Sequence, residues 1–232
     1  MKFEFDKNLY RLARAFEKRG ATLYIVGGFV RDALLGRPAG DIDLCSRLKL
    51  NQVEECAREC GFNYICLSSK MGVCKLTIKN EDGKVLSFEH ATFRKEKYKC
   101  DGSHTPIKVE FVDTIKMDSM RRDFTVNALY LNILKNRIFD PQNAKNDLKT
   151  HKICIIGDPN ARLCEDSERI LRAIRLAGAL GFSLDENTKN AIVRNKEKLK
   201  VLSKVRTDYE ISKIVDKSLL LELGIDKIIN ID

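Results

Sequence analysis

A glycine turn between an apolar run and an amphipathic segment constrains this chain more than any other feature. Leu23–Val26 form the apolar run, and Gly27 and Gly28 follow it. Apolar residues then recur at helical spacing over Phe29–Leu35, so the pattern predicts a strand, a tight turn and a helix. Glycines let backbone N–H groups approach an anion closely, and a helix N-terminus adds unsatisfied donors. The turn therefore predicts a phosphate-binding site, to which Arg31 would add a bidentate contact.

Two aspartates follow on what the pattern predicts to be the next strand. Asp41–Cys45 alternate polar with apolar residues, as a half-buried strand does, so Asp41 and Asp43 would share one face. Carboxylates this close repel each other, whereas hard cations such as Mg²⁺ bind carboxylate oxygens well. The pair therefore predicts a two-metal site for displacement at phosphorus. The alternative is a simple turn followed by two solvated surface aspartates.

The whole stretch resembles the class II tRNA nucleotidyltransferases and their close relatives, the bacterial poly(A) polymerases. The resemblance continues in order through FEHATFRKEKYKCDGSH, RRDFTVNALYLN, FDPQNAKNDL and CEDSERILRAIRLAGALGF, from about Leu23 to about Val215. It implies an α+β fold, with a polymerase-β-like nucleotidyltransferase head over residues 1–140 built on a mixed, mainly antiparallel sheet. An all-α neck domain for nucleotide recognition and RNA binding would occupy residues 141–232. Family members normally continue into a helical body and tail, which this chain is expected to lack.

The hydrophobic pattern changes near residue 140. Before it, short alternating runs predict a mixed sheet, with one helix at Gln52–Cys60. At the change, FDPQNAKNDL resembles the hinge of the family, and Asn143 is predicted to take the left-handed conformation that glycine usually holds there. Beyond it, Asp158 as N-cap, Pro159 at the first helical position and Gly181 at the end predict one long helix. Further helices are predicted near Glu186–Lys198 and Thr207–Leu223.

The resemblance assigns two further features to the sheet region. It places Glu89, in VLSFEHATF, as a third carboxylate of the metal site, although a lone strand glutamate is more often a solvent-exposed side chain. The segment FRKEKYKCDGSHTP matches a mobile segment near the site of the family, with Ser103 where an arginine is usual. Because of this difference, two alternatives stay open: the segment influences which nucleotide is chosen, as in the family, or it does not.

The segment MRRDFTVNALYL supplies candidate contacts to a nucleoside triphosphate. Arg121 and Arg122 would bind its phosphates. Asp123 and Asn127 lie four apart on one face of a predicted helix and would hold the ribose hydroxyls. The same residues also fit a structural helix start whose intervening apolar side chains pack inward.

The segment CEDSERILRAIRL carries the residues predicted to recognise the base. Asp166 and Arg169 lie three apart on the predicted long helix, and Glu165 would brace Arg169. A carboxylate acceptor beside guanidinium donors can hydrogen-bond the Watson–Crick edge of cytosine and, after a small shift, that of adenine. In the resembled family such a pair replaces a nucleic-acid template, and Arg172 is assigned to the same nucleotide site. The alternative is an ordinary ion pair on a helix surface.

The chain is basic, with 42 Lys and Arg against 33 Asp and Glu and a net charge of +9. Seven basic residues and one acidic residue fall within Lys189–Arg206. Such a face suits the phosphates of RNA, so Lys196, Lys198 and Lys200 are predicted RNA contacts. A solvated helix face is the alternative.

The eight cysteines show no metal-ligand spacing. The N-terminal segment MKFEFDKNLYRL is charged throughout, unlike a signal peptide, and no later apolar stretch reaches the length of a membrane span. A cytoplasmic protein with reduced thiols is therefore expected.

These features together predict an enzyme that adds C and A nucleotides to the 3′ end of tRNA without a template. It would use CTP and ATP, release pyrophosphate, and depend on two Mg²⁺ ions held by Asp41 and Asp43. A-adding, CC-adding or poly(A) polymerase activity is a narrower alternative. An inactive or split RNA-binding subunit is an alternative from another class, and a homo-oligomer or partner chain could then replace the tRNA grip of the missing body.

Overall fold

The computed structural model describes residues 2–103 and 105–229, and their contacts divide the chain into two compact units. The first unit contains the residues up to Lys95 together with Val109–Arg121 and Asn127–Gln142. The second contains Glu96–Lys108, Arg122–Val126 and the residues from Asn143 onward. Two short segments of the second unit therefore interrupt the first unit in sequence. The functional boundary predicted at residue 140 stays a prediction.

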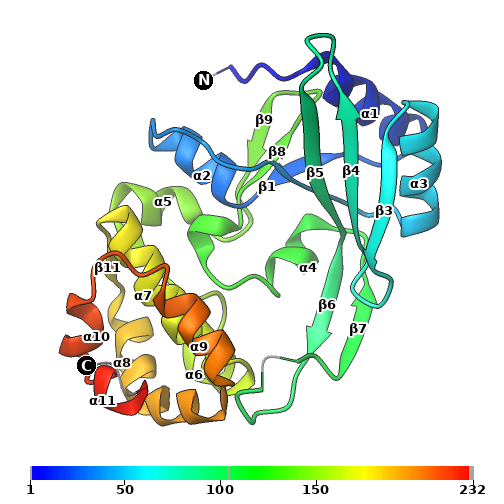
Figure 1. The fold of residues 1–232 in the computed structure, drawn as a ribbon. Helices are drawn as coiled ribbons and strands as arrows, with labels where there is room; N and C mark the ends of the chain where they lie inside the picture. Colours follow the sequence, from blue (N-terminus) through cyan, green and yellow to red (C-terminus); the bar gives the residue numbers. More distant parts are fainter. Residues whose placement is uncertain (1, 104, 230–232) are drawn as a thin grey trace. The chain divides into compact units, whose positions relative to one another are not determined.

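Among the described residues, seven strands of the first unit form one sheet in the order β3-β4-β5-β2-β1-β8-β9 (Figure 1). Neighbouring strands are antiparallel except β2 and β5, which are parallel. The prediction of an α+β fold with a mixed, mainly antiparallel sheet is therefore confirmed. The strands are β1 (Tyr24–Val26), β2 (Asp43–Ser46), β3 (Asn63–Ser68), β4 (Val73–Lys79), β5 (Val85–Thr92), β8 (Tyr130–Asn132) and β9 (Arg137–Phe139).

Helices cover both faces of this sheet. On one face α1 (Lys7–Lys18) and α3 (Leu50–Glu59) pack against each other (Figure 1), and the buried ring of Phe16 lies 5.7 Å from that of His90 on β5. On the other face α4 (Ile115–Ser119) packs against an aromatic cluster. The members of that cluster are Val26, Cys45, Phe93, Val112 and Tyr130, with Tyr24, Ile115, Met117 and Phe139 packed against them. The short helix α2 (Gly28–Leu34) follows β1 directly.

The second unit is mainly helical. Its central helix, α7, buries Ile170, Leu171 and Ile174 completely and packs against α6, α9 and α10. The elements are α5 (Ala144–Lys149), β10 (Lys152–Ile153), α6 (Pro159–Glu165), α7 (Glu168–Leu180), β11 (Ser183–Leu184), α8 (Glu186–Asn195), the 3₁₀ helix η2 (Lys196–Val201), α9 (Lys204–Ile211), α10 (Ser218–Glu222) and α11 (Asp226–Ile229). Strands β6 (Arg94–Lys97) and β7 (Lys108–Phe111) pair in a separate two-stranded sheet, and the residues of each strand are divided between the two units.

The predicted helix start at Asp158, the left-handed residue Asn143 and the predicted helix end at Gly181 are confirmed. The carboxylate of Asp158 accepts a hydrogen bond from the N–H of Asn160, with Pro159 at the first helical position of α6. Asn143 has the predicted left-handed conformation, with φ 57° and ψ 30°. Gly181 ends α7 with φ 65°. These signals are local, because each is a property of one turn and its own side chain.

Two longer helices predicted from the sequence are wrong. The helix expected after Asp158 breaks at Asp166, where φ is −150° and ψ is 98°, because Asp166 pairs as a β-bridge with Ser103. The helix expected over Thr207–Leu223 is likewise split into α9 and α10. Apolar spacing continues across both breaks, so periodicity alone could not locate them.

The segment from Asp123 to Asn127 does not form the predicted helix that would carry both residues on one face. Only one 3₁₀ turn forms, η1 (Thr125–Asn127), and Asp123 lies before it. The backbone N–H of Ile156 donates to Asp123 O at 3.0 Å, and that of Thr125 donates to Cys154 O at 3.0 Å. These bonds hold the segment extended, so the predicted shared face is wrong.

Cys100 and Cys164 form a disulfide bond in the second unit. The expectation of reduced thiols is therefore wrong for this pair, which lies 64 residues apart and meets only in the folded chain. The other six cysteines of the described residues form no disulfide bond. Within residues 2–103 and 105–229, no helix combines the length and the apolar character that crossing a bilayer requires.

Candidate functional site

Two candidate carboxylates meet at the junction of β2 and β5 in the first unit. Asp43 is the register partner of Glu89 in the parallel pairing, and both side chains are exposed. Paired residues on neighbouring strands point to the same face, about 5 Å apart along the hydrogen-bond direction. On its other side Asp43 pairs with Val26, the last residue of β1. The fold therefore brings Asp43 and Glu89 together from positions that lie far apart in sequence. We name this place, with Asp41, the carboxylate edge.

The position of Asp41 differs from its prediction. β2 begins at Asp43, because β1 ends at Val26 and offers no partner for the residues before it. Asp41 is exposed in the loop that leads into β2. The predicted strand over Asp41–Cys45 is therefore wrong in its first two residues, and the role of Asp41 at the carboxylate edge stays a prediction.

The glycine turn lies directly beside Asp43. Gly27 has φ 84° and ψ −143°, a conformation that residues with a Cβ rarely adopt. A Cβ added to Gly27 would lie 3.6 Å from Oδ2 of Asp43, so the turn approaches that carboxylate closely. Gly28 then begins α2. A phosphate bound at this turn would therefore lie beside the carboxylate edge.

Arg31 is held in place by two neighbours. Its Nε and one terminal nitrogen donate to the Asp32 carboxylate at 2.8 and 2.9 Å, and its other terminal nitrogen donates to Oδ1 of Asn127 at 2.6 Å. Asn127 was predicted to contact ribose, and here its carbonyl oxygen orients Arg31 instead. The phosphate contact of Arg31 and the ribose contact of Asn127 both stay predictions.

A buried aspartate missed by the sequence reasoning orients Arg121. Asp118 is fully buried, and its Oδ1 accepts from Nε of Arg121 at 2.8 Å and from the N–H of Arg94 at 3.2 Å. Its Oδ2 accepts from the hydroxyl of Tyr130 at 2.7 Å. Because the spacing of Asp118 and Arg121 is i, i+3, it was a readable signal for this pair. The arrangement fixes a candidate phosphate-binding guanidinium from within the core.

The donors of the carboxylate edge fit a hard cation that is shared with a phosphate ligand. Among residues 2–103 and 105–229, no three His, Cys, Asp or Glu side chains converge to form a protein-only metal site. Mg²⁺ does not need such a cage, because it usually keeps several waters and binds one or two carboxylates together with substrate phosphates. Asp43, Glu89 and the adjacent glycine turn match that donor set in kind.

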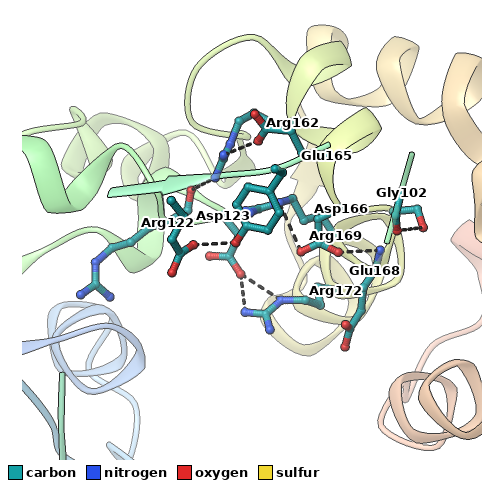
Figure 2. Close-up of polar contacts among 12 residues, drawn as sticks. Gly102, Arg122, Asp123, Arg162, Glu165, Asp166, Glu168, Arg169 and Arg172 are labelled. Carbon is teal, nitrogen blue, oxygen red and sulfur yellow. Dashed lines mark hydrogen bonds and ion pairs between the residues drawn. The ribbon is translucent and has the colours of Figure 1, made fainter. Parts of the chain in front are cut away.

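In the second unit, the buried Asp123 forms an ion pair with Arg172, whose side chain is 40 % exposed (Figure 2). Oδ2 of Asp123 accepts from Nε of Arg172 at 3.0 Å, and Oδ1 accepts from the N–H of Phe124 at 2.8 Å. Burial alone would raise the pKa of this carboxyl, but the charges of Arg172 and Arg169 outweigh it and lower the pKa of Asp123 to about 2. Asp123 therefore orients Arg172, while its predicted contact with ribose stays a prediction.

Asp166 and Arg169 lie together at the α6–α7 junction, residues 164–169. Oδ2 of Asp166 is 3.5 Å from Nε of Arg169, and Oδ1 of Asp166 accepts from the N–H of Glu168 at 3.1 Å. Arg169 is 4 % exposed, and its buried Nε has no hydrogen-bond partner among the described residues. The pair is therefore present, but it stands at a chain break and not along one helix.

Two neighbours of this pair differ from expectation. Glu165 was predicted to brace Arg169, but it binds Arg162 at 2.6 Å instead, and that prediction is wrong. Tyr98, which the sequence reasoning missed, donates its hydroxyl to Glu96 at 2.5 Å. Burial and the charge of Glu96 raise the pKa of Tyr98, and Arg169 opposes that effect.

Arg122 is the remaining candidate of the second unit. Its carbonyl oxygen accepts from Arg162 at 3.2 Å. Figure 2 shows its guanidinium directed away from the Asp123–Arg172 pair. The phosphate contact of Arg122 stays a prediction.

The three candidate RNA-binding lysines lie on the 3₁₀ helix η2 and not on α8. With three residues per turn, positions two apart point in different directions, so Lys196, Lys198 and Lys200 do not form the single face expected. Lys196 donates to Leu223 O at 2.8 Å, and Lys200 pairs with Glu197 at 2.6 Å. RNA binding by these lysines stays a prediction.

Comparisons with known proteins agree on one family. Residues 23–154 match the family model described as the poly A polymerase head domain. The chain is 35% identical to a CCA-adding enzyme of Geobacillus sp. (strain WCH70), over 97% of this chain and 54% of that protein.

Two solved structures resemble the chain. The CCA-adding enzyme of Bacillus stearothermophilus in complex with CTP is 31% identical with a TM-score of 0.74, over 90% of this chain and 49% of that one. The CCA-adding enzyme of Thermotoga maritima complexed with tRNA_CCA is 26% identical with a TM-score of 0.75, over 95% and 51%. The chain therefore spans about half the length of the relatives it matches.

Proposed function

The chain belongs to the family of the poly A polymerase head domain, and on this premise we propose that it is a template-independent nucleotidyltransferase. It adds C and A nucleotides to the 3′ end of tRNA, using CTP and ATP. One observation carries the proposal: the glycine turn at Gly27 lies against Asp43, which faces Glu89 across β2 and β5. This juxtaposition joins a phosphate-binding backbone to carboxylates suited to divalent cations. Relatives named CCA-adding enzymes, including one in complex with CTP, support the choice of substrate.

The reaction requires no nucleophile from the protein. The 3′ hydroxyl of the tRNA attacks the α-phosphate of the nucleotide, and pyrophosphate leaves. Asp41, Asp43 and Glu89 would hold two Mg²⁺ ions, which supply a lowered pKa at the attacking hydroxyl and charge neutralisation at the phosphate. The chain itself contributes positioning: the N–H groups at Gly27 and Gly28 bind phosphate, and the chain's arginines bind the charged tail.

The arginines are oriented before substrate arrives. Asp118 holds Arg121, while Asp32 and Asn127 hold Arg31. A guanidinium fixed in this way loses less conformational entropy when it binds a phosphate. In the second unit, Asp166 and Arg169 recognise the base, and the buried Nε of Arg169 gains the partner that the described residues do not supply. Arg122, Asp123 and Arg172 complete the nucleotide contacts of that unit.

The test is incubation of the full chain with tRNA that lacks its 3′ CCA, Mg²⁺ and each nucleoside triphosphate, alone and combined, followed by sequencing of the products. Addition of C, C and A in order supports the proposal. A-only or CC-only products, or a long A tail, would replace it with the corresponding narrower activity. No incorporation by protein that still binds tRNA would favour an RNA-binding subunit.

The proposal extends to how the enzyme holds tRNA and where in the cell it acts. Lys196, Lys198 and Lys200 contact RNA, and a second copy or a partner chain adds further grip on the tRNA. Measuring tRNA affinity at several protein concentrations tests the second copy, since binding that needs a dimer strengthens as protein concentration rises. A cytoplasmic location stays a prediction, checked by cell fractionation.

A further inference from the structure

The disulfide of the second unit lies at a place where it can control the α6–α7 junction. Cys100 belongs to the segment after β6, and Cys164 belongs to the last turn of α6. The bond therefore ties a connecting segment to the helix end that immediately precedes Asp166. Cys164 is two residues from Asp166, the candidate base-recognising carboxylate, so the bond can affect the position of that side chain.

Backbone and side-chain contacts continue the link toward Asp166. The N–H of Gly102 donates to Cys164 O at 2.7 Å, and the hydroxyl of the buried Ser167 donates to Gly102 O at 3.1 Å. Ser103 then forms the β-bridge with Asp166. These contacts require glycine at 102, because its φ is 77° and an added Cβ would lie 3.3 Å from Oγ of Ser167. The segment 100–103 thus lies along residues 164–167.

This contact sets the conformation of the junction. Asp166 is extended where the sequence alone continues a helix, and its carboxylate accepts from Glu168 N–H and approaches Arg169. When the sulfurs are separated, segment 100–103 loses its covalent link to α6 and is held by non-covalent contacts, among them the hydrogen bonds of Gly102. Local opening of such a segment then costs less free energy and occurs more often.

The two sulfurs of the bond are not enclosed in the core. Cys100 is exposed and Cys164 is half-buried. By contrast Cys56 and Cys74 are buried, and burial raises the pKa of their thiols to about 11 and about 12, so both stay protonated and unreactive near neutral pH. Small thiols and disulfides can therefore act on the Cys100–Cys164 pair while leaving the core cysteines unchanged.

We propose that Cys100 and Cys164 form a reversible thiol–disulfide modification site that locks and releases the α6–α7 junction. In the forward reaction the two thiols and one small-molecule disulfide, RSSR, give the protein disulfide and two RSH. One protein thiolate attacks RSSR and expels RS⁻, and the second thiolate attacks the mixed disulfide and expels another RS⁻. The two protons lost by the protein end on the two RSH molecules, and a small dithiol reverses the process.

The consequence for nucleotide choice rests on the proposed function. Recognition of both cytosine and adenine requires Asp166 and Arg169 to shift slightly between the two bases. A locked junction restricts that shift, so the oxidised form discriminates more strongly between CTP and ATP than the reduced form. Selectivity and not the overall rate is therefore the property under redox control.

The experiment prepares the full chain in two states, oxidised with glutathione disulfide and reduced with dithiothreitol. Mass spectrometry of proteolytic peptides should find the Cys100–Cys164 cross-link in the oxidised state alone. Hydrogen exchange of the amides in residues 100–103 and 164–168 should be at least about tenfold faster after reduction. The ratio of kcat/KM for CTP and ATP should differ by at least about threefold between the states.

Variants separate this site from the other thiols. The double variant Cys100→Ser/Cys164→Ser has no thiol at this site and should behave as the reduced protein under both treatments. Cys66→Ser, which removes an exposed cysteine of the first unit, should respond as the wild type does. An oxidised protein without the cross-link, or a cross-link with unchanged exchange, overturns the modification site. Active protein with an unchanged nucleotide ratio overturns its link to base choice. If neither state incorporates nucleotide, the proposed function fails, while the cross-link and the exchange rates still decide the site.

Discussion

The carboxylate edge and the α6–α7 junction hold their polar side chains in opposite ways. At the carboxylate edge, Asp43 and Glu89 are exposed and face each other through the register of β2 and β5. At the junction and beside it, Arg169 is 4 % exposed and Asp123 is 8 % exposed, and their positions depend on ion pairs and hydrogen bonds within the unit. The carboxylates of the first region are open to solvent, whereas the charged side chains of the second are enclosed by the unit itself.

This difference in burial predicts which substitutions affect catalysis and which affect the stability of the fold. An exposed carboxylate contributes little to folding, so its removal should affect chemistry and leave the fold intact. A buried charge in an ion pair supports the fold, because removing one partner leaves the other charge unpaired in a poor solvent. Substitutions in both regions test this contrast, from the largest expected effect to the smallest.

Asp43→Ala should reduce the rate of nucleotide addition by at least about 10³-fold, which is about 4 kcal/mol, because a cation ligand beside the reacting phosphate is lost. The midpoint of thermal unfolding should stay within about 2 °C of the wild type, since the side chain is exposed. Asp41→Ala should follow the same pattern. Primer-extension rates and calorimetry measure the two effects, with Asp82→Ala as an exposed control elsewhere in the first unit. More than about a tenth of the wild-type rate in Asp43→Ala would contradict the metal role.

Asp123→Ala should affect stability more than chemistry and lower the free energy of unfolding by about 3 kcal/mol. The reason is that the buried Arg169, together with Arg172, loses the carboxylate charge that faces it. Urea denaturation measures this loss. A value below about 0.5 kcal/mol would mean that the ion pair with Arg172 contributes as little as an exposed one.

The same carboxylate should also make stability depend on pH. Its pKa in the folded protein is lowered to about 2 from 3.8, so its contribution is fully present above about pH 4 and is lost as the pH falls toward 2. The shift corresponds to about 2 kcal/mol. The difference in unfolding free energy between wild type and Asp123→Asn should therefore shrink between pH 5 and 2, and an unchanged difference would refute the ion pair as its source.

Asp166→Ala should lower discrimination among the four nucleoside triphosphates by about 2 kcal/mol, or about 30-fold, because one acceptor of the base contact is lost. Rates with UTP and GTP should change less than the ratio does. Kinetics with each triphosphate measure the effect. An equal loss of rate with all four triphosphates would instead assign Asp166 a role in folding or in phosphate binding. Asp166 would then resemble Asp123, whose main expected contribution is to stability.

The lysines of η2 should show the smallest effect. Replacing Lys196, Lys198 and Lys200 together with Gln should raise KM for tRNA a few-fold and flatten the salt dependence of binding, which changes by about 0.9 in log–log slope per phosphate contact on duplex. Because Lys196 and Lys200 already have partners, Lys198→Gln alone should account for most of the change. If tRNA binding is insensitive to salt and unchanged in the triple variant, the RNA-binding surface lies elsewhere on the protein.

The sequence by itself determined the features that depend on neighbouring residues. The glycine turn, the cap at Asp158, the left-handed Asn143 and most strands were readable because each follows from local backbone preference or from alternation over a few residues. The mixed, mainly antiparallel character of the sheet and the family also followed, since the order of the motifs carries both.

Only the tertiary structure decided how distant residues pair. The register that sets Asp43 against Glu89, the burial of Asp118 beneath Arg121 and the meeting of Cys100 with Cys164 depend on contacts between separated segments. The break at Asp166 has the same origin, because its bridge to Ser103 replaces the helical hydrogen bonds that local propensity favours. Periodicity reports which face of a segment is apolar, whereas a pairing between distant segments is fixed by the free energy of the whole packed unit.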